Sequence, residues 1–217
     1  KAVHLDAVAE REGLPLLRFD YSGHGQSSGH WRDGTISKWV AESLAIFRHA
    51  APHTCVLVGS SMGAWSTLRL LAELHTAGEG HRIKGLVLIA PAPDFAMELI
   101  EPNLTDKELS DLATQGWFEE PSDYLTEPNR WSKAFLEDGH ANRVLSGIIE
   151  THGPVHILQG MRDEDVPHTH ALKLVSHLPS DRVTLTLVPD GDHRLSRPED
   201  LALLERTVLG LLAEAAD

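Results

Sequence analysis

Cysteine, tyrosine and basic residues are scarce in this chain of 217 residues. The single cysteine, Cys55, excludes an internal disulfide and any zinc site built from several cysteines. Only 19 Lys and Arg stand against 32 Asp and Glu, and the formal charge of −13 argues against nucleic acid or an anionic membrane as a partner. No apolar run approaches the roughly 18 residues of a membrane span, and the first residues do not resemble a signal peptide. We therefore expect a globular, cytoplasmic protein.

Apolar runs of strand length alternate with amphipathic helical patterns along most of the chain. One helix is expected to end at Gly13, and others are expected over 35–50, 64–75, 169–178 and 198–215. Strands are expected at 15–19, 54–58, 85–90, 155–158 and 183–188. Unbroken apolar strands separated by helices predict an α/β fold with a doubly wound, mostly parallel sheet, in one domain spanning residues 1–217.

This alternation stops between about residues 92 and 150, in a long acidic stretch with helical patterns at 107–115 and 131–137. We expect it to form a small helical cap over one end of the sheet. Trp117, Phe118 and Trp131 lie within it. They either line a pocket or attach the cap to the body of the protein, and the sequence leaves both possibilities open.

The first motif with chemical meaning is Gly59-Ser60-Ser61-Met62-Gly63, which directly follows a predicted buried strand and directly precedes a predicted helix. A strand, a tight turn and a helix are the setting of a nucleophile elbow. We expect both glycines to be needed because side chains at 59 and 63 would collide with neighbouring backbone. The turn would expose the Ser61 hydroxyl near a helix N-terminus, which favours developing negative charge.

A serine nucleophile needs a base, and the base needs a carboxylate that orients it. Asp163 and His193 each follow a predicted strand, at the sheet edge where open α/β folds place their sites. The chain order of serine, acid and histidine also fits an elbow of this type. Glu164 and Asp165 are alternative acids, since either side chain could turn toward an imidazole.

Other histidines and loops are weaker candidates. His24 lies in the loop 20–27, which lacks the ending of a phosphate-binding loop and is interpreted as the rim of the site. His168 and His170 are the next candidates for the base, and they lack the spacing and supporting ligand of a metal site. We expect no metal and no cofactor. Cys55 is expected to be a small buried apolar residue.

These segments together resemble a known family, the α/β-hydrolases, and within it the small serine hydrolases related to mitochondrial palmitoyl-protein thioesterase and mycophenolic acid acyl-glucuronide esterase. The resembling segments are residues 18–23, 58–63, 160–163, 166–167 and 192–194. The resemblance implies that Ser61 is the nucleophile, Asp163 the acid and His193 the base, with the backbone N–H of Met62 as one oxyanion donor. Ala64 replaces a glycine of many relatives, and a methyl group is tolerable inside a helix.

The resemblance and the residues together predict a serine hydrolase that cleaves carboxylic esters or thioesters through an acyl-enzyme intermediate. Its substrate would be a small acyl ester or thioester, or an acylated protein. Two alternatives remain: a ligand-binding protein on a hydrolase scaffold, and a peptidase or carbon–carbon hydrolase that uses the same three residues.

One part of the family's site is not found in the sequence. In an α/β-hydrolase a second oxyanion donor comes from a loop that precedes the first helix. We therefore expect roughly 30–50 further residues upstream, enough for two or three strands and their turns. The alternative source of the second donor is the loop Ser22–Gly25.

Overall fold

The computed structural model describes residues 1–50, 54–122, 126–178 and 182–216. The helices are α1 (Ala2–Glu12), α2 (Ile36–Ala50), α3 (Met62–Thr76), α4 (Asp106–Thr114), α5 (Lys133–Ala141), α6 (His168–Ser176) and α7 (Pro198–Ala216). The strands are β1 (Cys55–Ser60), β2 (Ile83–Ile89), β3 (Trp117–Glu120), β4 (Asn129–Ser132), β5 (Val155–Gly160) and β6 (Val183–Val188). Short helical turns are η1 (Trp31–Asp33), η2 (Gly80–Arg82), η3 (Ala96–Ile100) and η4 (Glu101–Asn103). Among these described residues, no helix is long and apolar enough to cross a membrane.

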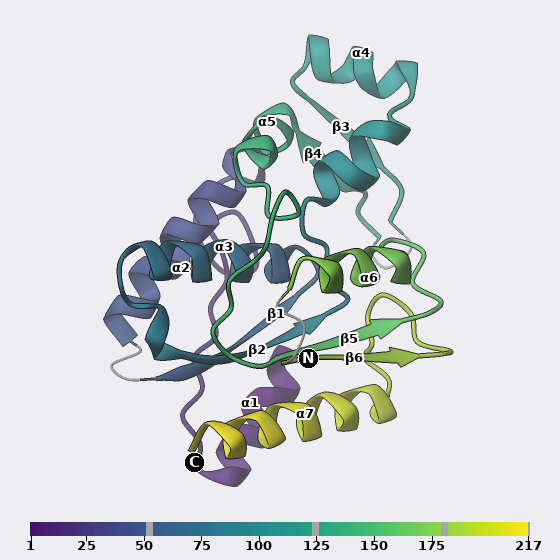
Figure 1. The fold of residues 1–217 in the computed structure, drawn as a ribbon. Helices are drawn as coiled ribbons and strands as arrows, with labels where there is room; N and C mark the ends of the chain where they lie inside the picture. Colours follow the sequence, from purple (N-terminus) through teal and green to yellow (C-terminus); the bar gives the residue numbers. More distant parts are fainter. Residues whose placement is uncertain (51–53, 123–125, 179–181, 217) are drawn as a thin grey trace.

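The central sheet confirms the predicted parallel α/β architecture. Its strands lie in the order β1-β2-β5-β6, and every neighbouring pair is parallel. Figure 1 shows α2, α3 and α6 on one face of the sheet and α1 and α7 on the other. The carboxyl ends of all four strands consequently meet at one edge, where their following loops lie close together.

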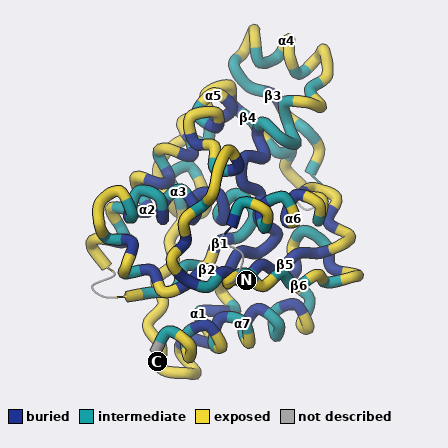
Figure 2. The backbone as a smooth tube through the Cα atoms, viewed as in Figure 1, coloured by how far each residue is buried: buried dark blue, intermediate teal, exposed yellow. Residues whose placement is uncertain are grey.

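Helices cover both faces of the sheet, and its two central strands, β2 and β5, are almost wholly buried, which explains why their apolar residues do not simply alternate with polar ones. On one face, Leu71 and Leu74 of α3 and Leu174 of α6 pack against Leu86 and Ile157. On the other face, side chains of α1 and α7 pack against β2 and β5. Figure 2 shows that the buried residues follow the sheet and the inner sides of these helices.

The expected strand at 15–19 is not present. Residues 14–20 form no described helix or strand, and they are exposed, with Leu17 at 53%. Among the described residues, β1 pairs only with β2, and no strand pairs with the segment 14–20. Apolar residues with strand propensity do not make a strand unless a neighbour accepts their backbone hydrogen bonds, so the pattern alone was insufficient. The expectation of upstream strands stays a prediction.

Between β2 and β5 the chain forms the stretch expected as a cap, which contains η3, η4, α4, β3, β4 and α5. Figure 1 shows α4, β3 and β4 projecting beyond the sheet. The helix expected at 107–115 is confirmed as α4, which buries none of its residues. The helix expected at 131–137 begins instead at Lys133, because Trp131 pairs with Phe118 in an antiparallel hairpin and the Ser132 side chain caps α5. Residues 123–125 of the predicted insertion lie outside the described residues, and its domain boundaries stay a prediction.

His170 ties α6 to the segment that follows β2. Its ring is 5% exposed, and Nε2 lies 2.7 Å from the Pro93 carbonyl oxygen, to which a ring N–H can donate. Burial is the main reason that the pKa of His170 is lowered from 6.5. His170 is therefore a structural residue that joins the start of α6 to the segment after β2, at the carboxyl edge of the sheet.

The lowered pKa of His170 predicts a pH dependence of stability. The folded protein binds fewer protons at this ring than the unfolded chain does, so the stabilisation is fully present above about pH 6.5 and is lost as the pH falls towards the folded pKa. In His170→Gln, the free energy of unfolding from urea titrations between pH 5 and 7 should vary less with pH than in the wild type. The control is His49→Gln, at an exposed position, and an unchanged slope in His170→Gln would contradict the assignment.

Candidate active site

Ser61 lies in a strained turn between β1 and α3. Its φ of 54° and ψ of −124° are unusual for a residue with a side chain. Two backbone hydrogen bonds hold this conformation: the Ser61 N–H donates to the Ile89 carbonyl at 2.9 Å, and the Ala92 N–H donates to the Ser61 carbonyl at 3.3 Å. The turn therefore has the strand–turn–helix form that the sequence predicted.

The two glycines of the motif differ in what they contribute. A Cβ at Gly59 would lie 2.7 Å from both the Gly63 carbonyl oxygen and the Ala64 Cα, and this backbone cannot move away cheaply. A Cβ at Gly63 would meet no described atom within 4 Å. The expectation of a collision is confirmed at 59 and is wrong at 63, because the side of α3 at residue 63 is open among the described residues.

The structure brings together the three residues that the sequence singled out. His193 Nε2 lies 3.0 Å from Ser61 Oγ, and His193 Nδ1 lies 2.9 Å from Asp163 Oδ2. An ionised carboxylate can only accept hydrogen bonds, so Nδ1 carries the proton and Nε2 is left to accept from the Ser61 hydroxyl. The Asp163 side chain is fully buried, and that of His193 is 17% exposed, which limits access of water to the pair.

Asp163 is held by groups other than His193. Its Oδ1 accepts from the Val166 N–H at 2.8 Å and the Asp165 N–H at 3.1 Å, and its Oδ2 accepts from Gln159 Nε2 at 3.0 Å. A buried carboxylate that accepts from this many donors cannot rotate freely. The sequence pattern did not identify Gln159 as a partner of Asp163, because a glutamine inside an apolar strand gives no signal of what it bonds.

Gly160 brings the loops that carry Asp163 and His193 together. A Cβ at this position would lie 2.4 Å from the Gly191 carbonyl oxygen and 2.6 Å from that of Asp192. The Arg162 N–H also donates to the Gly191 carbonyl at 2.9 Å. The loop after β5 can therefore contact the loop after β6 directly, which allows the imidazole to reach the carboxylate.

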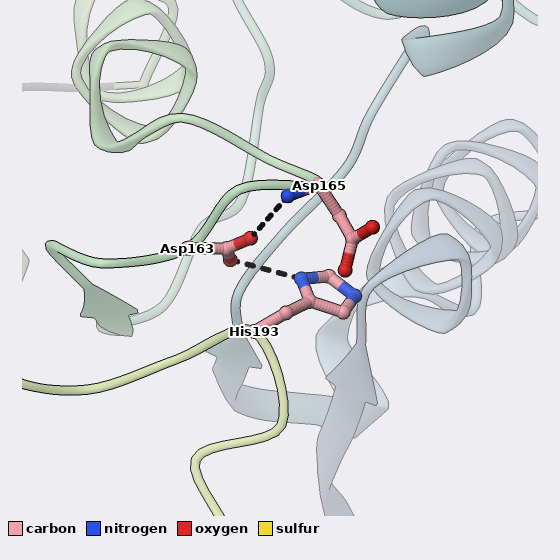
Figure 3. A group of neighbouring side chains, drawn as sticks. All are labelled: Asp163, Asp165 and His193. Carbon is pink, nitrogen blue, oxygen red and sulfur yellow. Dashed lines mark hydrogen bonds and ion pairs between the residues drawn. The ribbon is translucent and has the colours of Figure 1, made fainter. Parts of the chain in front are cut away.

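The alternative acids differ from Asp163 in burial. Glu164 and Asp165 are exposed. The Asp165 carboxylate nevertheless lies near the ring: one ligand atom each of Asp163, Asp165 and His193 fall within 4.8 Å of one another (Figure 3). A metal ion bound by these three residues would compete with the hydrogen bond between Asp163 Oδ2 and His193 Nδ1.

The other candidate histidines do not join this group. His24 is exposed and packs edge-on against Trp39, and His170 bonds Pro93 as described above. The loop Ser22–Gly25 is held against α2, where the Ser22 N–H donates to Glu42 and the Ser22 carbonyl accepts from Trp39. None of its residues lines the cavity beside Ser61, so the structure gives no support to this loop as the second oxyanion donor.

A cavity of about 480 Å³ lies between Ser61 and the segment that joins β2 to β5. Its apolar wall consists of Met62, Ala92, Phe95, Leu99, Ile100, Leu104, Phe118, Pro121, Trp131 and Val166. Phe118 and Trp131 therefore line the cavity, whereas Trp117 packs against Trp31 and Arg32 and is not part of the lining. Trp131 fulfils both roles that the sequence left open. It lines the cavity, and it also packs on Phe95 and Phe135 and so attaches this segment to the body of the protein.

Met62 begins α3, and the first N–H groups of a helix have no acceptor within it. Met62 also lines the cavity beside Ser61. Ala64 is completely buried within α3, as a residue that replaces a helical glycine can be. Cys55, at the start of β1, is partly buried against the core, and burial raises its pKa.

The sequence and the fold were compared with those of known proteins. Residues 2–203 match the Alpha/beta hydrolase family. The chain is 32% identical over 216 residues to mouse palmitoyl-protein thioesterase ABHD10, mitochondrial, covering 98% of this chain and 70% of the relative. The crystal structure of a candidate hydrolase from Agrobacterium vitis is 54% identical with a TM-score of 0.94, covering 96% of this chain and 80% of that one. Mouse alpha/beta hydrolase domain-containing protein 10 is 29% identical with a TM-score of 0.84, covering 98% and 83%.

The expectation of a cytoplasmic protein is contradicted by these relatives, because the thioesterases of mouse, human and rat are all named mitochondrial. Cellular location is decided by targeting segments that receptors read. The composition and hydropathy of a folded domain do not reveal it.

The predicted fold and the resemblance are both confirmed. The parallel sheet with its covering helices, the turn at Ser61, the family match over residues 2–203 and the similar solved structures all agree. This chain belongs to the alpha/beta hydrolase family.

Proposed function

We propose that this protein is a serine hydrolase that cleaves carboxylic esters or thioesters through an acyl-enzyme intermediate. The observation that carries the proposal is the unbroken line of hydrogen bonds from Asp163 through His193 to Ser61, the last two of which line a cavity with an apolar wall. A serine hydroxyl is a weak nucleophile by itself, and this line supplies both the base and the group that orients the base.

In the proposed reaction Ser61 Oγ forms a bond to the acyl carbonyl carbon while its proton passes to His193 Nε2. The Met62 N–H donates to the carbonyl oxygen as that oxygen gains negative charge. His193 then gives the proton to the departing alcohol or thiol, whose bond to the carbonyl carbon breaks. A water molecule next loses a proton to His193 and attacks the acyl-serine, and the proton returns to Ser61 as the carboxylic acid leaves.

Two observations support an acyl substrate. The apolar wall of the cavity, with Phe95, Leu99, Phe118 and Trp131, suits a hydrocarbon chain. The relatives in five mammals are named palmitoyl-protein thioesterases, which act on such a chain. A small acyl ester or thioester, or an acylated protein, is therefore the proposed substrate.

A ligand-binding protein that keeps the three residues without using them is the first alternative, and it differs in having an unreactive Ser61. A peptidase or a carbon–carbon hydrolase is the second, and it differs only in the substrate cleaved. A panel of esters, thioesters, peptides and ketones with a cleavable carbon–carbon bond, all with matched acyl groups, separates the second alternative from the proposal.

A fluorophosphonate probe should label the protein at Ser61, because the hydrogen-bonded imidazole activates that hydroxyl. Intact-mass and peptide mass spectrometry check this, with Ser61→Ala expected to remove the label. Ser60→Ala is the control and should keep it. A protein that folds but remains unlabelled would support the ligand-binding alternative.

Replacing His193 with Ala should lower kcat for a simple acyl ester by about 10³ or more, because no other base reaches Ser61 Oγ among the described residues. Steady-state kinetics on variants with normal melting temperatures check this. His168→Ala is the matched control and should lose less than about threefold. A loss below tenfold in His193→Ala would place the base elsewhere.

Asp163→Asn should reduce kcat/KM by about 10³ or more, because an amide at this position can donate to His193 Nδ1 and favours the wrong tautomer. Asp165→Asn should reduce kcat/KM for a neutral ester far less, since His193 Nδ1 is held by Asp163 and the Asp165 side chain is exposed. The reverse ranking in kcat/KM would make Asp165 the acid.

A further inference from the structure

Gln159 places a polar side chain at a fully buried position of the central sheet. It lies near the end of β5, after residues 155–158, and its exposed fraction is 0%. Its backbone pairs with Leu187 of β6. Successive residues of a strand alternate between the faces of the sheet, so the Gln159 side chain leaves the same face as that of Ile157. The amide is therefore attached to a buried and rigid part of the sheet.

Three acceptors surround the Gln159 amide nitrogen. Nε2 lies 3.0 Å from Asp163 Oδ2, 3.0 Å from the Gly160 carbonyl oxygen and 3.0 Å from the Val166 carbonyl oxygen. Carbonyl oxygens and an ionised carboxylate only accept hydrogen bonds, so the NH₂ end of the amide must face them. Gly160 and Val166 stand at the two ends of the loop that carries Asp163. One NH₂ group therefore connects the carboxylate to both ends of its loop.

The two carboxylate oxygens of Asp163 are held by different partners. Oδ1 accepts from the backbone N–H groups of Asp165 and Val166, which belong to the same loop. Oδ2 accepts from His193 Nδ1 at 2.9 Å and, among the other described residues, only from Gln159 Nε2. Figure 3 shows one oxygen turned towards the Asp165 N–H and the other towards the His193 ring. Gln159 is thus the second partner of the oxygen that orients the proposed base.

A second partner for Oδ2 matters because the base changes during the proposed reaction. His193 gains and loses a proton in each half of the cycle, and the Ser61 hydroxyl leaves its hydrogen bond with Nε2 and later returns to it. An imidazole that changes in this way cannot by itself fix the position of Oδ2. A donor on β5 can, because this strand is hydrogen-bonded to β2 on one side and to β6 on the other.

We infer that Gln159 is a positioning residue of the proposed hydrolase: it holds Asp163 Oδ2 where that oxygen orients the ring of His193. The inference rests on the function proposed above and adds one residue to the three that carry the reaction. Gln159 does not line the cavity beside Ser61, so it acts through Asp163 and does not touch the substrate. Its loss should therefore slow the chemical step and leave substrate binding unchanged.

The first test is steady-state kinetics on Gln159→Met, whose side chain has a similar length and no donor. For a simple acyl ester, kcat should fall by about 10- to 100-fold and KM should change by less than about twofold. Ile157→Val is the matched control, because Ile157 is also completely buried, on the same strand and face. Its kcat should fall by less than about twofold. A Gln159→Met protein with the kcat of the wild type would overturn the inference.

A double-mutant cycle distinguishes action through Asp163 from a general effect on the fold. Residues that act as a unit are strongly non-additive. Introduced into Asp163→Ala, Gln159→Met should therefore lower the remaining kcat by less than about twofold. A loss in Asp163→Ala as large as the loss in the wild-type background would overturn the inference and leave Gln159 a purely structural role. Gln159→Asn keeps an amide that is one carbon shorter, and it takes the place of Gln159→Met in every measurement if that variant does not fold.

A spectroscopic measurement separates this inference from the proposed function. The proton between His193 Nδ1 and Asp163 Oδ2 is expected to give a downfield proton NMR resonance in mildly acidic buffer, assigned by its loss in His193→Ala. In folded Gln159→Met this resonance should shift by more than about 0.5 ppm, or broaden through exchange with water, because its hydrogen bond loosens. In Ile157→Val it should stay within about 0.1 ppm of the wild type.

The NMR result does not require catalysis. A resonance that changes in Gln159→Met but not in Ile157→Val supports the inference, even if the fluorophosphonate probe leaves Ser61 unlabelled. An unchanged resonance in Gln159→Met overturns the inference, while labelling of Ser61 and ester hydrolysis by the wild type would still support the proposed function.

Discussion

The backbone at Ser61 can hold an unfavourable conformation because the sheet and α3 bind it on both sides. A non-glycine residue at φ 54°, ψ −124° costs of order 1–3 kcal/mol. The bonds of Ser61 to Ile89 and Ala92 attach it to the end of β2, and the buried side chains Trp65, Leu68 and Leu71 anchor α3. The rest of the site depends on this turn, because it sets where the Ser61 hydroxyl stands.

The other two residues reach Ser61 through topology. Ser61 and His193 are separated by 132 residues, and Asp163 and His193 by 30. In a parallel sheet, the loops after β1, β5 and β6 leave the same edge, so these separations disappear in space. Gly160 and the hydrogen bond from Arg162 to Gly191 then bring the loops after β5 and β6 into direct contact. This contact places Asp163 and His193 within hydrogen-bonding distance of each other.

The segment between β2 and β5 combines packing with electrostatics. Trp131 packs on Phe95 and Phe135 and at the same time donates to Glu120. One residue therefore attaches the hairpin to the body of the protein and orients a carboxylate in the cavity. The overall charge of −13 does not determine the electrostatic potential inside such a cavity, because salt screens exposed charges that lie more than about 8–10 Å away. Arg130 and Lys107 pair with acids that do not line the cavity.

The sequence by itself determined the parallel sheet, the turn at Ser61 and the order of serine, acid and histidine. These features rest on local patterns: apolar runs of strand length, helical periodicity, and Gly59, whose missing side chain the turn requires. Only the tertiary structure decided what depends on contacts between distant segments. It left residues 14–20 without a strand partner, paired Trp131 with Phe118 where a helix was expected, and turned Phe118 but not Trp117 into the cavity. It also separated Asp163 from Glu164 and Asp165, three adjacent acids of nearly equal chemistry, because only Asp163 is buried where Gln159, Val166 and His193 can bond it.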